Sequence, residues 1–155
     1  MIAHLNKKNK PKIVDISKKN KTTRIAKAQG IIQFSKKTFK EIESFKTKKG
    51  EITNTAIIAG ILGAKKTNEI IPLCHNILIE NVDIDIRSIK NKNIFVITSK
   101  VKSYGKTGVE MEALTGTCIA CLTIYDMCKS IDKKILIKEI KLLEKKGGKS
   151  NFLRS

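Results

Sequence analysis

Two cysteines, Cys118 and Cys121, have the Cys-x-x-Cys spacing of redox and zinc motifs. They fall in the middle of an expected helix, whereas a redox pair normally sits at a helix N-terminus, where the dipole favours thiolate. Zinc would require further ligands, and the chain has two histidines and no second such pair. We interpret these cysteines as small buried hydrophobic residues. A cysteine metal or redox module is kept as an alternative.

The same expected helix carries Asp126 and Lys129, which are three positions apart and can touch. On a solvated surface such an ion pair contributes under ~1 kcal/mol to the stability of the fold. The neighbouring run from Leu122 to Cys128 is too apolar for a free surface, so we expect the pair to be partly buried. Burial changes the pKa of such groups and makes proton transfer possible.

Other candidate groups lie in loops. Cys74 and His75 follow Pro72, where a lone histidine is more often structural than catalytic. Lysines are mixed with glycines at 105–108 and 147–150, and such runs can cradle phosphates. Neither run has Walker spacing, so each indicates a nucleotide ligand only weakly.

The elements that must position these groups follow from hydrophobic periodicity and turn signals. Thr107-Gly108-Val109-Glu110 predicts a capping box at the start of one helix. In chain order we expect an N-terminal arm at 1–22, a strand at 24–34, a helix capped by Ser35 and carrying Phe39, Ile42 and Phe45 and closed by Lys48-Lys49-Gly50, a helix at 53–70, a hairpin of strands at 82–87 and 94–101, a helix at 107–129, a strand at 135–143 and a tail at 145–155.

This order predicts a single α+β domain over residues 1–155, with helices packed on one face of a mainly antiparallel sheet. Apolar residues make up 41% of the chain, which is enough for a core and excludes a disordered or disulfide-stapled protein. No run approaches ~18 apolar residues, so no membrane span is expected. The first twelve residues lack a secretory apolar region, so we expect a cytoplasmic protein with reduced thiols.

The formal net charge of +18 favours an anionic ligand. The basic residues are 29 lysines and three arginines, and the chain has no tryptophan. Base readout relies on arginine and single-strand binding on aromatic platforms, so the composition argues against nucleic-acid recognition. A non-catalytic basic nucleotide- or RNA-binding domain stays the main alternative to an enzyme.

Seven segments, read together, resemble one family, the cyclic pyranopterin monophosphate synthases of molybdenum cofactor biosynthesis (protein C family). They occur in the order of the family and span most of the chain. They are Lys49-Gly50-Glu51, Ala59-Gly60-Ile61, Ala64-Lys65-Lys66-Thr67, Ile71-Pro72-Leu73-Cys74-His75, the run from Gly105 to Thr115, the run from Leu122 to Lys129, and Gly147-Gly148-Lys149-Ser150.

The resemblance implies a ferredoxin-like α+β subunit and a homohexamer, a trimer of dimers, with active sites at dimer interfaces. It also implies a lyase reaction that rearranges (8S)-3′,8-cyclo-7,8-dihydroguanosine 5′-triphosphate to cyclic pyranopterin monophosphate and releases diphosphate. It implies no organic cofactor or resident metal, although Mg²⁺ could travel with the substrate phosphates. Nucleic acid and membrane are not expected as partners.

The family pattern also assigns roles to residues of this sequence. It implies substrate contacts at Leu73, Cys74, His75, Met111 and Glu112 and catalytic roles for Asp126, Lys129 and Lys49. It implies basic groups near the triphosphate at Arg24 and Lys145 and a polar group near the pocket at Glu110. Two departures loosen the match: Asn76 stands where the family has proline, and Asn151 where it has glycine.

Simple chemistry agrees with these roles. Lysines that are desolvated or crowded by cations bind their proton less tightly, so Lys49 and Lys129 could shuttle protons near neutral pH. We expect Asp126 to orient and tune Lys129, and Glu112 to hold the guanine-derived ring. Glu112 and Asp126 are about 21 Å apart on a straight helix at ~1.5 Å per residue, so we expect two subunits to share one site.

Overall fold

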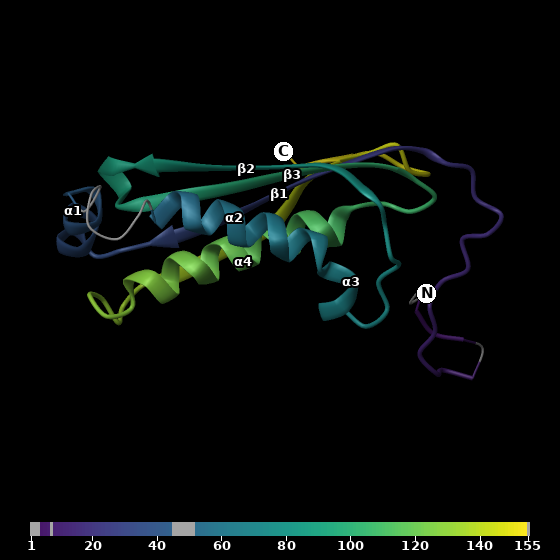
Figure 1. Ribbon diagram of the computed structural model, residues 1–155, viewed down its shortest axis with the longest axis horizontal. Helices are drawn as coiled ribbons and strands as arrows, with labels where there is room; N and C mark the ends of the chain where they lie inside the picture. Colours follow the sequence, from purple (N-terminus) through teal and green to yellow (C-terminus); the bar gives the residue numbers. More distant parts are fainter. Residues whose placement is uncertain (1–3, 7, 45–51, 155) are drawn as a thin grey trace.

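The computed structural model describes residues 4–6, 8–44 and 52–154, which form an antiparallel sheet with helices on one face (Figure 1). The strands are hydrogen-bonded in the order β2-β3-β1-β4-β5. The elements are β1 (Thr22–Gln33), α1 (Lys36–Ser44), α2 (Ile52–Lys65), α3 (Thr67–Ile70), β2 (Ile79–Ile89), the 3-10 turn η1 (Lys90–Lys92), β3 (Ile94–Gly105), α4 (Glu110–Cys128), β4 (Leu136–Lys146) and β5 (Phe152–Leu153). The predicted α+β, ferredoxin-like architecture is confirmed.

Strand alternation decides which face is covered. In β1 and β3 every second side chain is buried beneath α2 and α4, as at Ala28 and Ile97, while intervening residues such as Lys100 lie on the open face. The buried set divides into two clusters. One contains the edge-to-face rings of Phe34, Phe39 and Phe95 near α1, and the other gathers small residues around the first turns of α4.

Small residues let α2 lie directly against α4. A Cβ added at Gly60 would stand 2.5 Å from Ile84 Cδ1 and 2.8 Å from the carbonyl oxygen of Gly116. No side chain larger than hydrogen fits between these groups. The buried residues of α2 are all small, namely Ala56, Gly60, Gly63 and Ala64, and they form its contact with α4.

Buried hydroxyl groups fix α4 on the sheet. Ser99 of β3 donates a hydrogen bond to the Ala113 carbonyl at 2.5 Å and lies 2.8 Å from the hydroxyl of Thr117. Thr117 also donates to the Ala113 carbonyl, at 3.0 Å. All three residues are fully buried, so these bonds set the register of the helix against the strand.

Several predicted boundaries hold and others move. Ser35 caps α1 as expected, since its Oγ accepts the Thr38 amide at 3.2 Å. The helix predicted at 53–70 is two helices, α2 and α3, which are separated at Lys66. Phe45 and the Lys48-Lys49-Gly50 stop lie outside the described residues.

The predicted capping box is wrong. α4 begins at Glu110, three residues later than expected, and Val109 occupies the N-cap with no side-chain hydrogen bond. The Glu110 carboxylate instead forms an ion pair with Lys145 at 3.2 Å. An ion pair with Lys145 of β4 has replaced the hydrogen bond to the local backbone that the capping-box pattern predicted.

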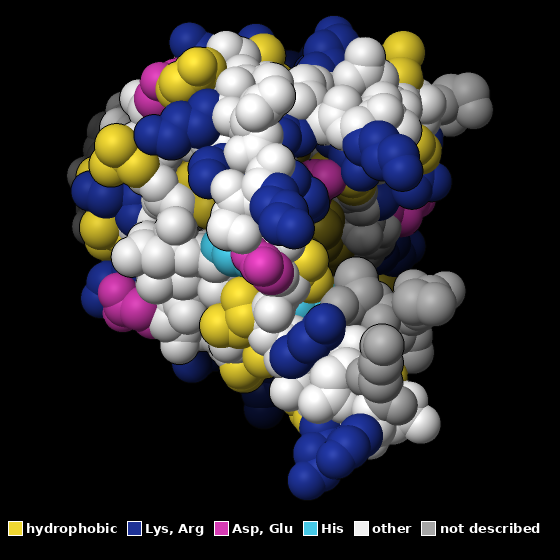
Figure 2. Space-filling view, turned by 90° about the vertical axis from the view of Figure 1, so that its right-hand side faces the viewer, with side chains coloured by type: hydrophobic (Ala, Val, Ile, Leu, Met, Phe, Trp, Pro, Cys, Tyr) yellow, Lys and Arg dark blue, Asp and Glu magenta, His cyan; other side chains and the backbone are white. Residues whose placement is uncertain are grey.

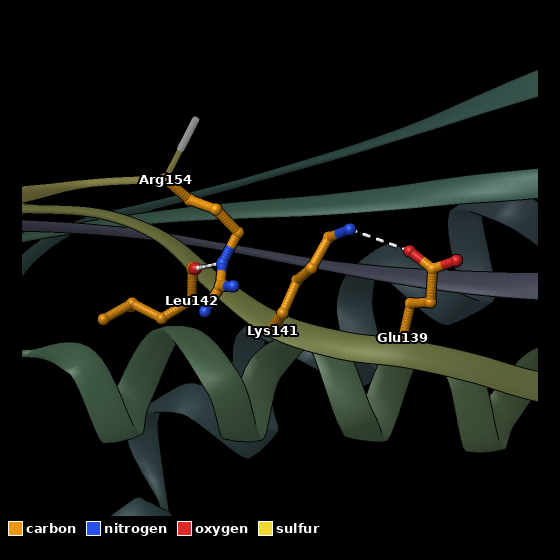
Figure 3. Close-up of polar contacts among 4 residues, drawn as sticks. All are labelled: Glu139, Lys141, Leu142 and Arg154. Carbon is orange, nitrogen blue, oxygen red and sulfur yellow. Dashed lines mark hydrogen bonds and ion pairs between the residues drawn. The ribbon is translucent and has the colours of Figure 1, made fainter.

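The predicted tail at 145–155 also begins too early, because β4 continues to Lys146 and β5 returns along it. Figure 3 shows how Arg154 ends this return. Its Nε donates to the Leu142 carbonyl at 2.9 Å, and its backbone amide donates to the Leu143 carbonyl at 2.8 Å. Nearby, Lys141 pairs with Glu139 at 2.7 Å where the strand is irregular. These contacts hold the C-terminal segment on the sheet.

Among the described helices, none has the length and apolar character that a bilayer crossing demands.

The Gly60 contact yields a stability prediction. Gly60→Ala should lower the free energy of unfolding by up to about 2 kcal/mol, because overpacking a tight contact costs about 1–3 kcal/mol and alanine in a helix offsets about 1 kcal/mol of this. Denaturant unfolding measures this. Gly105→Ala is the control, since its Cβ would meet nothing nearer than Ser103 Oγ at 3.6 Å. Equal stabilities of the two variants would contradict the close packing.

Candidate active site

Two cavities adjoin at the N-terminal end of α4. The first, of about 310 Å³, is called here the His75 pocket and is lined by His4, Leu73, Cys74, His75, Ile77, Thr107, Gly108, Glu110, Met111 and Glu112. The second, of about 260 Å³, is called the lysine pocket and is lined by Lys19, Arg24, Ile25, Lys106, Thr107, Gly108, Glu110, Lys145, Lys146, Gly148, Lys149 and Ser150.

The two pockets share a wall formed by Thr107, Gly108 and Glu110, so one extended ligand could occupy both. Six residues predicted near the substrate (Leu73, Cys74, His75, Glu110, Met111 and Glu112) meet in the first pocket. Arg24 and Lys145 meet Glu110 in the second. Figure 2 views this end of the molecule, where basic side chains surround hollowed surface with acidic and histidine side chains between them.

The lysine pocket is strongly cationic, because among the described residues that line it six are lysine or arginine and one, Glu110, is acidic. Lys145 is held by the Glu110 carboxylate, and Arg24 Nε donates to the Gly105 carbonyl at 3.2 Å. Lys106 Nζ donates to the Ser17 carbonyl at 2.7 Å, which ties the N-terminal arm to this wall. Positioned cations of this kind bind polyphosphates.

The loop after β4 completes the lysine pocket through Gly147. Its φ of +84° favours glycine, and a Cβ there would overlap the Thr23 carbonyl oxygen. Asn151 accepts the Gly147 amide at 3.2 Å, and Thr22 donates to the Gly147 carbonyl at 2.7 Å. Asn151, which departs from the family pattern, therefore closes this loop by its own hydrogen bond.

Glu112 is the main buried acid of the His75 pocket. It is 4% exposed, and its Oε2 has no hydrogen-bond partner among the described residues. Burial raises the pKa of this carboxyl to about 7, and the charge of Glu110 adds to the effect. Near neutral pH the group therefore exists in both protonation states, and it can either donate or accept a hydrogen bond to a ligand.

His75 and Cys74 lie on the loop after α3. His75 Nε2 is 2.7 Å from the Val14 carbonyl, and because a carbonyl only accepts, Nε2 carries the proton. Burial, followed by the charge of Glu112, raises the pKa of the Cys74 thiol. Asn76 is exposed, and the loop is held through its neighbour His75.

Asp126 and Lys129 are in contact but lie apart from both pockets. Lys129 Nζ is 2.6 Å from Asp126 Oδ1, and the side chains are 59% and 69% exposed respectively. The expected partial burial is therefore wrong within a single chain. Glu112, Leu122 and Asp126 belong to a row of side chains spaced three and four positions apart along α4. Such a row drifts around a straight helix, so it is buried at Glu112 and exposed at Leu122 and Asp126.

The hydrogen bond and charge of Asp126 raise the pKa of Lys129 within the isolated chain. This is opposite to the lowered pKa expected for a proton-shuttling lysine. Lys49, the third predicted catalytic residue, lies outside the described residues. The α4 helix leads from the pockets toward the α1 end of the molecule (Figure 1), so one chain does not unite Asp126 with Glu112.

The helix cysteines belong to the core. Cys121 and Cys128 are fully buried, and burial, with a smaller effect of Cys118, raises the pKa of Cys121 to about 12. Among the described residues no group of three or more His, Cys, Asp and Glu side chains could hold a metal ion. The prediction that Cys118 and Cys121 are small buried hydrophobic residues is confirmed for Cys121, whereas Cys118 is half-buried.

Sequence reasoning missed His4 and Lys19 as site residues. Both come from the N-terminal arm, and contacts over long sequence separations, such as Val14 with His75, bring the arm to the pockets. No spacing pattern signals such contacts. The glycine–lysine runs at 105–108 and 147–150 were visible in the sequence, but their meeting in one cavity was not.

Residues 13–148 match the MoaC family. The chain belongs to this family. It is 52% identical over 155 residues to the cyclic pyranopterin monophosphate synthase of Campylobacter jejuni subsp. jejuni serotype O:6 (strain 81116 / NCTC 11828), with 99% of each chain covered. It is 51% identical to proteins of the same name from Helicobacter hepaticus (99% of this chain and 97% of the other) and Helicobacter pylori strain Shi470 (96% and 94%).

Most residues that line the two pockets lie within the segment that matches the MoaC family. Of the lining residues, His4 precedes this segment, and Lys149 and Ser150 follow it. The resemblance inferred from the sequence is therefore confirmed.

Glu112 yields a pH prediction. Its pKa is about 7 in the native state and 4.5 ordinarily, so the native protein holds the proton of Glu112 more tightly than the unfolded chain does. This proton stabilises the native state fully below pH 4.5, and the contribution is lost as the pH rises toward 7. From pH 4.5 to 8 the wild type should lose on the order of 2–3 kcal/mol relative to Glu112→Gln. Unfolding curves across this range at equal protein concentration test this, and parallel pH profiles of the two proteins would contradict it.

Proposed function

We infer that this chain is a lyase that forms cyclic pyranopterin monophosphate from 3′,8-cyclo-7,8-dihydroguanosine triphosphate and releases diphosphate, within molybdenum cofactor biosynthesis. The observation that carries this conclusion is the 52% identity to a cyclic pyranopterin monophosphate synthase over 99% of both chains. The site agrees with such a substrate, since a cationic pocket adjoins one with a buried acid.

In this proposal the lysine pocket holds the triphosphate and the His75 pocket holds the guanine-derived ring. Closing a cyclic phosphate while expelling diphosphate increases negative charge on phosphate oxygens, which fixed cations such as Arg24 and Lys145 can stabilise. Glu112 contacts the ring and can donate or accept a proton near neutral pH. Leu73 and Met111 provide apolar contact to the same ring.

Lys49 and Lys129 are proposed to move the protons of the rearrangement, with Asp126 orienting Lys129. Because Asp126 and Lys129 lie far from the pockets of their own chain, we propose that a second copy brings them to the site. The expected assembly is a homohexamer, a trimer of dimers. Exposed apolar side chains on the two long helices, including Ile58, Leu62 and Leu122, support burial of this surface between copies.

In such an interface the desolvation of Lys129 would oppose the effect of Asp126 and lower its pKa toward the range useful for proton transfer. We propose no resident metal or organic cofactor, and Mg²⁺ could accompany the substrate phosphates. The proposed location is the cytoplasm, and no nucleic acid or membrane is proposed as a partner.

Turnover tests the function directly. The protein incubated with the cyclic dihydroguanosine triphosphate should release diphosphate and form a pterin, both measurable by chromatography. Lys129→Ala and Lys49→Ala should each reduce kcat at least about 100-fold, as expected for loss of general acid–base groups. Lys133→Ala, at an exposed lysine outside the pockets, is the control.

Near-normal turnover in either variant would remove that lysine from the mechanism. No turnover in the wild type, together with steeply salt-dependent binding of random RNA, would favour the alternative of a basic RNA-binding domain.

The shared site predicts complementation between inactive variants. An equal mixture of Lys129→Ala and Glu112→Ala subunits, after exchange, should regain about a quarter of wild-type turnover, because half of the dimers are mixed and each mixed dimer has one intact site. Mass spectrometry of the native assembly confirms exchange. Absence of activity in exchanged assemblies would contradict a site that takes Lys129 from one copy and Glu112 from another.

A further inference from the structure

The N-terminal arm forms part of both pockets, although it precedes the sheet. His4 lines the His75 pocket and Lys19 lines the lysine pocket. Between them, the Val14 carbonyl lies 2.7 Å from His75 Nε2, and the Ser17 carbonyl accepts a hydrogen bond from Lys106 Nζ at 2.7 Å. The arm is therefore fixed at two points and borders both cavities.

A turn formed by the arm itself positions His4. The Asn6 side chain accepts the amides of Lys8 and Lys10 at 2.8 and 3.0 Å, and Leu5 is bridged to Pro11. The Lys12 amide donates to the His4 carbonyl at 2.9 Å. These bonds hold the backbone of His4 without using its side chain, so the imidazole is available for another partner.

The His75 pocket contains two polar atoms with unmet hydrogen-bonding capacity. His4 Nδ1 and Glu112 Oε2 are both closed to solvent, and neither has a partner among the described residues. Both residues line the same cavity of about 310 Å³. A buried polar atom without a partner is costly, so two of them in one cavity point to a ligand that carries both donors and acceptors.

We propose that His4 is a substrate-binding residue whose imidazole makes a hydrogen bond to the heterocyclic end of the nucleotide-derived substrate, in the pocket that also contains Glu112. This inference rests on the proposed function. His4 lies in the His75 pocket and does not line the lysine pocket, so it contacts the ring end and not the phosphates. A half-turn of an imidazole exchanges the positions of nitrogen and carbon, so the ring can present either nitrogen to the ligand.

Steady-state kinetics with the cyclic dihydroguanosine triphosphate tests the proposal. His4→Ala should raise KM about tenfold, which corresponds to about 1.4 kcal/mol, while kcat changes less than about twofold, as expected for lost uniform binding. Inhibition by diphosphate, a ligand of the lysine pocket alone, should stay unchanged. Lys10→Ala, at an exposed residue of the same turn, is the control and should retain wild-type KM.

Two conservative variants separate hydrogen bonding from packing. The amide of asparagine lies near the position of histidine Nδ1, and the amide of glutamine lies near that of Nε2. His4→Asn or His4→Gln should therefore have a KM close to that of the wild type. Failure of both, or a matching loss of diphosphate inhibition in His4→Ala, would reduce His4 to a structural support of the arm and overturn the proposal.

The outcome also distinguishes this inference from the function on which it rests. A wild type that turns over with an unchanged KM in His4→Ala overturns the role of His4 and leaves the proposed function standing. A wild type that forms no pterin and no diphosphate overturns both.

Discussion

The placement of α4 on the sheet is the constraint on which the site depends. The hydroxyls of Ser99 and Thr117 meet the Ala113 carbonyl in a fully buried layer, and Ala113 directly follows Glu112 in the sequence. Because the helix cannot shift along β3 without breaking these bonds, the acids of its first turn keep fixed positions in the pocket walls. The Glu110–Lys145 pair then links this turn to β4. Binding residues that are remote in sequence thus share one rigid support.

The two pockets differ in their electrostatics although they share a wall. Glu110 lies within reach of cations, whereas Glu112, two residues later, is buried and has its pKa raised to about 7. The helix turn places these two acids in different surroundings, Glu110 beside Lys145 and Glu112 in the buried wall of the His75 pocket. A ligand with an anionic end and a neutral ring end matches this arrangement better than a uniformly charged polymer does.

Much of the fold follows from the sequence because it is local. Alternation identified the strands around Ile84 and Ile97, and Ser35 marked a helix start. The prediction of a capping box was wrong because Glu110 forms an ion pair with Lys145, which lies 35 positions away in sequence. For the site, the family motifs located the residues of the His75 pocket. The exposure of Asp126 and Lys129 could not be predicted from spacing, since it depends on how the helix is oriented against the sheet.

The contact between Gly60 and Gly116 limits how this protein can respond to a ligand. With backbone against backbone, the two long helices have little freedom to separate or slide. Adaptation to an incoming molecule must therefore come from the segments that border the cavities, namely the N-terminal arm and the loop around Gly147. The parts of the site that can adjust then lie near the two ends of the chain, and changes made there should alter affinity while leaving the helical layer intact.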